Sequence, residues 1–140
     1  MTQRKFIASL AAVVLSGVAA AALAAPQTLA VTILGPGGHS NGDYGNTNAL
    51  HAGARAVLLI EKAVPTAMIS DMKGGVSVNA IAADCHFLVT IADDAEAAKV
   101  RKAVDEGVAA ENAFRGVKPG QTRNGVQIDV RAEVKAAGSL

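Results

Sequence analysis

Residues 27–45 read QTLAVTILGPGGHSNGDYG, an alternating apolar pattern that runs directly into a glycine-rich segment. Leu29, Val31 and Ile33 alternate with small or polar residues, which predicts a half-buried strand over residues 27–34. Five glycines and one proline among the next eleven residues exclude helix and central strand, so residues 35–45 are predicted to form a loop. This loop carries His39 between two strongly patterned elements, where functional residues are often found.

The chain after this loop predicts a helix, two strands and a second helix. Asn46, Thr47 and Asn48 offer N-caps for a first helix, whose apolar residues recur at helical spacing up to Pro65. We expect a second strand over residues 66–73, a break at Gly74-Gly75, and an extended segment over residues 76–91 that becomes regular from Asp84. Asp93-Asp94 is predicted to cap a second helix that ends near residues 112–116.

The strongest strand pattern lies near the C-terminus, over residues 126–135. Apolar side chains are expected on one face and polar ones on the other, namely Val126, Ile128, Val130, Ala132 and Val134 against Gln127, Asp129, Arg131, Glu133 and Lys135. Such a strand covers a core on one side and meets water on the other.

The predicted order β-α-β-β-α-β is that of the ferredoxin-like α+β fold, a four-stranded antiparallel sheet with two helices on one face. The second and fourth strands then form the edges of the sheet. The fourth carries charges that discourage strand addition, whereas the second carries one charge among mainly apolar residues: Ala67, Met68, Ile69, Ser70, Asp71 and Met72. The second strand either pairs with another chain or is a short edge shielded by a loop.

The first 24 residues have the pattern of a secretory signal. Arg4 and Lys5 precede an apolar run rich in alanine, and Ala22-Leu23-Ala24 fits the rule for cleavage after Ala24. The alternative is an uncleaved anchor helix. Cleavage predicts a periplasmic or secreted protein, free of the membrane, whose single domain spans residues 25–140.

The composition of the chain argues against nucleic-acid binding and against an intramolecular disulfide. Loss of Arg4 and Lys5 takes the 13 basic residues to 11, against 12 acidic ones, and the chain has no Trp and one Tyr. It therefore lacks both the basic surface and the stacking residues of a nucleic-acid binder. Cys85 is the single cysteine, so no intramolecular disulfide forms, and it is either a buried thiol or a link between chains.

Catalytic and metal-binding motifs are missing from the sequence. His39, His51 and His86 have no acidic or histidine partner at the spacing of a zinc site, and we expect no metal and no cofactor. His51 is predicted to be a surface or interface residue and His86 to be solvated. No nucleophile motif or phosphate-binding loop occurs, and the glycines after the first strand do not have dinucleotide-binding spacing.

Two separate motifs resemble a known family. Residues 35–52, with Gly35-Pro36-Gly37-Gly38-His39-Ser40, and residues 74–82, GGVSVNAIA, are similar to the dimerisation (lid) domain of the M20 zinc metallopeptidases, nearest to its tripeptidase-like branch. The resemblance implies a domain that pairs with a second copy, while a separate catalytic domain supplies the zinc ligands and the catalytic glutamate. It also implies that His39 reaches the partner's active site to polarise the scissile carbonyl and that Asn79 helps to bind substrate.

One family residue is absent. The arginine that binds the substrate carboxylate would fall at Ala92, and its loss removes a bidentate contact. His39 is then either a working residue or a relic bonded to local backbone, and Asn79 either binds substrate or stabilises its turn. Gly37, Gly38, Gly74 and Gly75 are expected to serve backbone geometry.

These observations predict an exported domain without hydrolase activity of its own, which forms a homodimer through its second strand and first helix. The alternatives are the lid subunit of a split M20 peptidase, which would act with a separate zinc catalytic chain, a truncated peptidase remnant, and a small-ligand binder that uses the His39 loop.

Overall fold

The computed structural model describes residues 25–137, so the predicted signal peptide lies outside the described residues. The elements follow in the order β1 (Gln27–Leu34), α2 (Ala49–Ala63), β2 (Met68–Gly74), β3 (Asp84–Ile91), α3 (Asp94–Phe114), β4 (Thr122–Arg123), β5 (Val126–Gln127) and β6 (Arg131–Ala136). Between residues 25 and 137, neither helix is both long and apolar enough to cross a membrane.

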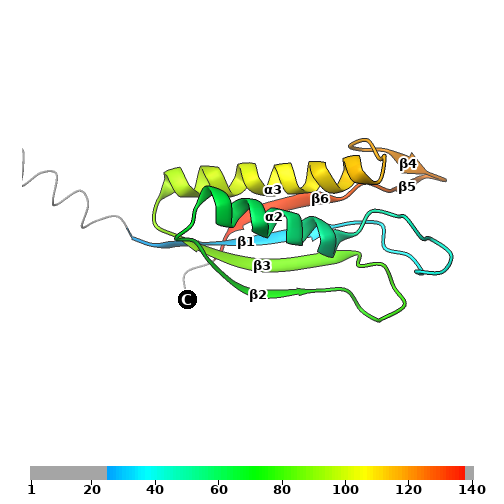
Figure 1. Ribbon diagram of the computed structural model, residues 1–140, viewed down its shortest axis with the longest axis horizontal. Coiled ribbons are helices and arrows are strands. Elements are labelled where there is room, and N and C mark those ends of the chain that lie inside the picture. The colour runs from blue at the N-terminus through cyan, green and yellow to red at the C-terminus, as the bar shows by residue number, and fades with distance from the viewer. Residues whose placement is uncertain (1–24, 138–140) are drawn as a thin grey trace, which may run out of the picture.

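Four strands form one antiparallel sheet in the order β2-β3-β1-β6, and α2 and α3 lie together on one of its faces (Figure 1). The predicted ferredoxin-like α+β fold is confirmed, with β2 and β6 at the two edges. Leu29 of β1 pairs with Ala136 of β6, so the first and last strands of the domain begin and end side by side.

The core lies between the central strands and the two helices. Every second residue of β1 and β3 is buried on the helix side, namely Leu29, Val31, Ile33, Cys85, Phe87, Val89 and Ile91. The face of β3 that carries Cys85 is therefore a core face.

Both helices begin where polar residues cap them. The Asn48 side chain accepts hydrogen bonds from the backbone N–H groups of Leu50 and His51, and that of Asp93 accepts one from Glu96. The helices approach closely at Gly107 of α3, where an added Cβ would lie 2.7 Å from the backbone nitrogen of Ala56 in α2.

The predicted continuous strand over residues 126–135 is wrong. Val126 and Gln127 pair instead with β4 in a small hairpin, and β6 begins only at Arg131. The turn of the hairpin is Asn124-Gly125, whose φ angles of 52° and 78° suit a two-residue connection. Val126, expected in the core, is 58% exposed.

Between the hairpin and β6, three consecutive residues are buried, which breaks the alternation. Asp129 was expected to face water, yet it is only 4% exposed, and its Oδ2 accepts a hydrogen bond from the Gly120 N–H at 2.8 Å. The next residue, Val130, is held by the Asn112 side chain of α3, which accepts from its N–H and donates to its carbonyl. The backbone groups of Gly120 and Val130 thus form hydrogen bonds with side chains rather than with a neighbouring strand.

Candidate functional site

The loops that follow β1 and precede β3 lie side by side at one end of the sheet (Figure 1). Antiparallel pairing of Leu34 with Asp84 brings them together, and backbone hydrogen bonds continue the contact beyond the strands. The Ile81 N–H donates to the Gly38 carbonyl at 2.8 Å, and the Ser40 N–H donates to the Asn79 carbonyl at 2.9 Å. The glycine loop is therefore held in place by the segment that carries Asn79.

His39 and Asn79, which the sequence singled out separately, meet at this end. His39 Nε2 lies 3.4 Å from Asn79 Nδ2. The Asn41 backbone N–H can only donate, and its nitrogen lies 3.3 Å from His39 Nδ1. In the tautomer in which Nδ1 accepts this bond, the neutral ring carries its proton on Nε2. The Ser77 hydroxyl donates to Asn79 Oδ1 at 2.8 Å, which leaves Nδ2 as a donor. In this tautomer two hydrogen-bond donors, His39 Nε2 and Asn79 Nδ2, face one another, and an incoming carbonyl or carboxylate oxygen is the group that could accept from both.

The glycines of the two loops permit these close contacts. An added Cβ at Gly38 would lie 2.7 Å from the Asp43 carboxylate, which accepts the His39 N–H at 2.9 Å. At Gly74 an added Cβ would collide with the carbonyl oxygen of Asp84. Gly37 and Gly75 have φ angles of 68° and 78°, a region that L side chains rarely adopt.

Ala92, the position of the missing arginine, is exposed at the end of β3, and its N–H donates to Glu96 Oε2 at 2.7 Å. It offers no side chain to a carboxylate. Within residues 25–137, no group of three or more His, Cys, Asp or Glu side chains could hold a metal ion.

The outer edge of β2 is a second candidate site. Met68 is 70% exposed and Met72 is 41% exposed on this strand, while Leu58 of α2 is 67% exposed. Ala67 lies just before the strand and, with Ile69, packs against the core. The edge of the sheet and its neighbouring helix thus both present apolar side chains to solvent.

A β-bulge, which the sequence analysis missed, interrupts this edge. Ser70 pairs with Leu88 and Lys73 with His86, so Asp71 and Met72 both lie opposite the single residue Phe87. Asp71 has a φ of 53°. The neighbouring residues have a strand-like pattern and do not indicate a bulge. The one local indication is that Asp tolerates a positive φ better than most residues.

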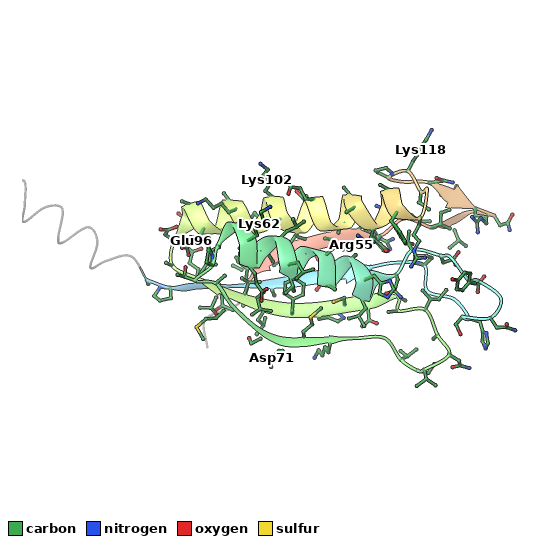
Figure 2. The ribbon with its side chains drawn as sticks, in the orientation of Figure 1. Arg55, Lys62, Asp71, Glu96, Lys102 and Lys118 are labelled. Atoms are coloured by element: carbon green, nitrogen blue, oxygen red, sulfur yellow. The ribbon has the colours of Figure 1, made fainter. Side chains whose placement is uncertain are left out.

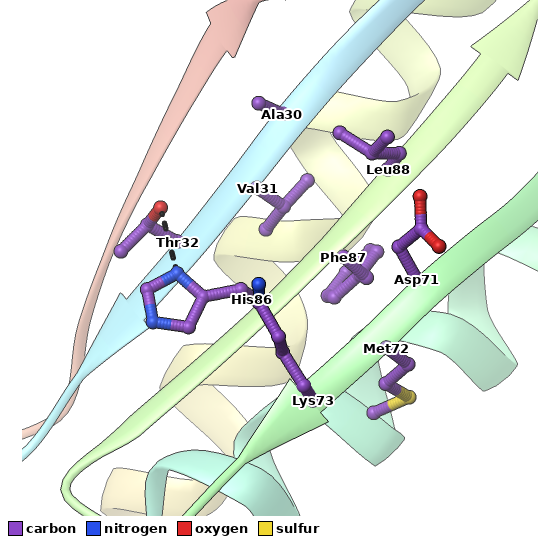
Figure 3. Close-up of a pocket in the computed structure, with 9 residues that line it drawn as sticks. All are labelled: Ala30, Val31, Thr32, Asp71, Met72, Lys73, His86, Phe87 and Leu88. Atoms are coloured by element: carbon purple, nitrogen blue, oxygen red, sulfur yellow. Dashed lines mark hydrogen bonds between the residues drawn. The ribbon is translucent and has the colours of Figure 1, made fainter.

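The remaining histidines lie elsewhere. His51 is exposed on α2, as expected. His86, predicted to be solvated, is half-buried on the sheet face that the helices leave open, where Nε2 lies 2.9 Å from Asp84 Oδ2 and Nδ1 lies 3.4 Å from the Thr32 hydroxyl. It borders a shallow hollow of about 470 Å³ that also includes Asp71 and Lys73 (Figure 3).

Cys85 is fully buried beneath α2, and the expectation of a buried thiol is confirmed. Burial, and then the charge of Asp84, raise the pKa of the thiol to about 11. An added Cβ at Gly53 would collide with its sulfur, so α2 covers it directly. A thiol in this position is protonated at neutral pH and poorly placed to react.

Known proteins share the fold and the sequence pattern. Residues 27–139 match the family model described as the peptidase dimerisation domain. No curated protein matches the chain.

Solved structures of larger proteins contain a region with a similar fold. A hydantoinase/carbamoylase family amidase from Burkholderia ambifaria matches with a TM-score of 0.58 and 22% identity, over 81% of this chain and 28% of that one. An aminobenzoyl-glutamate utilization protein from Klebsiella pneumoniae matches with a TM-score of 0.55 and 20% identity, over 81% and 28% of the two chains. This chain spans little more than a quarter of the length of these proteins, and the likeness shows the fold. Because the family model matches residues 27–139, well over half of the chain, the protein belongs to the family of M20 peptidase dimerisation domains.

Proposed function

We propose that this chain is an exported, non-catalytic dimerisation domain, which self-associates through the β2 edge and the adjoining face of α2. The observation that carries the proposal is that β2 and α2 each leave large apolar side chains exposed, namely Met68 and Met72 of β2 and Leu58 of α2. Pairing of two β2 strands would satisfy the free backbone groups of the edge. Contact between these side chains would contribute about 25 cal/mol per Å² of buried apolar surface, before the entropy of association is deducted.

The opposite edge is unsuited to this role. Arg131, Glu133 and Lys135 are exposed along β6, and Glu133 and Lys135 form a surface ion pair at 3.2 Å. Charged side chains along an edge discourage addition of another strand. The two edges of the sheet therefore differ in chemistry, and β2 is the edge that favours a partner.

The test is the mass of the purified chain by light scattering across a dilution series. A dimer that persists on dilution supports the proposal, and Leu58→Lys and Met68→Lys are each expected to weaken it about tenfold or more, since a charge then replaces an apolar contact. Val126→Lys is the matched control, because Val126 is also more than half exposed but lies in the β4–β5 hairpin. A chain that stays monomeric at high concentration would contradict the proposal.

The paired donors on His39 and Asn79 favour a second function, in which this domain acts as the lid of a separate M20 catalytic chain. The resemblance implies that these residues act on a substrate held by a partner. The two nitrogen atoms lie 3.4 Å apart, and in the tautomer in which His39 Nδ1 accepts the Asn41 N–H, a carbonyl oxygen could accept a hydrogen bond from both. Tyr44, Val76 and Val78 are 88% exposed or more in the same two loops, so these loops also present large side chains with apolar surface to solvent. The alanine at position 92 weakens this function, since no guanidinium stands there for a substrate carboxylate.

Reconstitution with an exported M20 zinc catalytic domain tests the lid function. His39→Ala is expected to lower kcat of the pair by about a hundredfold to a thousandfold, since one hydrogen-bond donor to a developing oxyanion is lost. His86→Ala is the control, because His86 lies on the open face of the sheet. Equal rates with and without this chain would dismiss the lid function and leave self-association intact.

Two further parts of the proposal rest on the sequence: that the chain is exported, and that it is nearest to the tripeptidase-like branch of the family. The apolar run before Ala24 supports export, and N-terminal sequencing of the protein from the periplasmic or extracellular fraction is expected to begin at Ala25. A chain retained in the cytoplasm with Met1 in place would instead fit a remnant that is no longer exported.

A further inference from the structure

Two arginines from different helices converge on one buried carboxylate. Glu111 of α3 has no exposed surface, and its Oε1 lies 3.8 Å from Arg55 Nε of α2 and 3.7 Å from Arg115 Nε at the end of α3. Neither carboxylate oxygen and neither Nε has a hydrogen-bond partner among the described residues. Figure 2 shows Arg55 on the helical side of the molecule.

The aromatic ring of Phe114 lies close to both guanidinium groups. The Arg55 guanidinium carbon lies 5.1 Å from the centroid of the ring and that of Arg115 lies 5.0 Å from it. Both distances are within the range of cation–π attraction. Contact with the carboxylate and with the ring therefore fixes the position of both arginine side chains.

The charges of this group do not cancel. Glu111 neutralises one of the two guanidinium groups, which leaves one net positive charge in a partly buried setting. Arg55 keeps 37% and Arg115 keeps 20% of the side chain exposed, so the group reaches the surface. His51, one turn before Arg55 on α2, lies with Nδ1 3.4 Å from Arg115 Nη2. Arg115 thus has a neighbour for one nitrogen, and within residues 25–137 Glu111 is the only carboxylate that forms an ion pair with either arginine.

We propose that Arg55 and Arg115 form a binding site for a small oxyanion, a carboxylate or a phosphate, at the surface between α2 and α3. Guanidinium groups bind such anions through paired, charge-assisted hydrogen bonds, and two groups already fixed in place lose little entropy on binding. Glu111 is the positioning residue, because its buried charge offsets the repulsion between the two arginines. The site is separate from the His39–Asn79 pair and does not depend on either proposed function.

The experiment follows the arginine Nε–H resonances of the purified chain by NMR during titration with inorganic phosphate and, in a second arm, with acetate. Chloride keeps the ionic strength constant. We expect the Arg55 and Arg115 signals to move together along one saturable curve. Saturation with phosphate alone identifies a phosphate site, and saturation with acetate alone identifies a carboxylate site.

Arg55→Lys is expected to weaken the binding about tenfold, since lysine keeps the charge beside Glu111 but loses the planar fork. Arg123→Lys, in the exposed β4–β5 hairpin, is the matched control and is expected to leave the affinity unchanged. If Arg55→Lys fails to fold, the titration of the unsubstituted chain still shows whether phosphate or acetate binds at Arg55 and Arg115. Shifts that never saturate with either anion, or that are as large at Arg123 as at Arg55, would overturn the proposal.

Discussion

Gly107 and Ala56 set the distance between the two helices. A Cβ at position 107 would lie 2.7 Å from the nitrogen and 2.8 Å from the Cα of Ala56, both of which belong to the backbone of α2. Backbone atoms in the middle of a packed helix cannot turn aside as a side chain can. The close packing of α2 against α3 therefore requires a glycine, which has no side chain, at position 107.

We expect Gly107→Ala to lower the free energy of unfolding by about 1–3 kcal/mol, because the overpacked contact outweighs the gain in helix propensity of about 1 kcal/mol. Urea unfolding followed by circular dichroism measures the change. Gly42→Ala is the matched control, since an added Cβ there would meet nothing within 4 Å. An unchanged midpoint for Gly107→Ala would mean that the helices separate without cost.

Asp71 carries the left-handed backbone of the bulge in β2. We expect Asp71→Val to lower the free energy of unfolding by about 1–2 kcal/mol, since a β-branched residue is strained at a φ of 53°. Asp71→Asn is the control and is expected to leave stability nearly unchanged, because Asn tolerates this conformation. Thermal unfolding compares the two, and equal losses would point to the charge of Asp71 rather than to its backbone.

Glu111 is expected to be the most costly charged residue to remove. Glu111→Leu leaves two guanidinium groups facing each other without a counter-charge, and we expect a loss of about 3–5 kcal/mol in the free energy of unfolding. The control is Glu106→Leu, which breaks an exposed pair with Lys102 at 3.9 Å on the same helix and is expected to change stability by less than about 1 kcal/mol. Similar urea midpoints for the two variants would show that the buried pair contributes no more than a surface pair.

Cys85 predicts a pH dependence of stability. Its pKa is raised in the folded protein from 9.0 to about 11, so the folded state holds the thiol proton more tightly than the unfolded state. This contribution is complete below pH 9 and is lost as the pH rises through 11, up to about 3 kcal/mol. Urea unfolding at several pH values is expected to show a steeper decline for the parent chain than for Cys85→Ala. Parallel declines would exclude a role for the thiol.

Local patterns predicted most of the fold. The alternation over β1, the helical spacing of α2 and the polar caps at Asn48 and Asp93 are set by neighbouring residues, and all are present in the structure. The prediction of one strand over residues 126–135 was wrong because the apolar and polar residues alternate throughout this segment, although the backbone does not form a continuous strand there. Contacts from Gly120 and Asn112 bury Asp129 and hold Val130, and no short-range pattern contains them.

The candidate sites depend on still longer-range relationships. The sequence indicated His39 and Asn79 as candidate site residues. Their contact depends on the register in which β1 pairs with β3, and the sequence did not predict that register. The pairing of Arg55 with Glu111 joins two helices and could not be predicted from the spacing of charges along either one. The bulge at Asp71 depends on how β2 meets β3, which a single strand does not encode.

The pairing of Leu29 with Ala136 has a mechanical consequence. Both ends of the folded unit leave from the end of the sheet opposite the His39 and Asn79 loops (Figure 1). A host protein could therefore carry this unit within one of its own surface loops, since the two junctions would need only a short span. Mounted in this way, the sheet would act as a stiff arm that holds its loops away from the point of attachment.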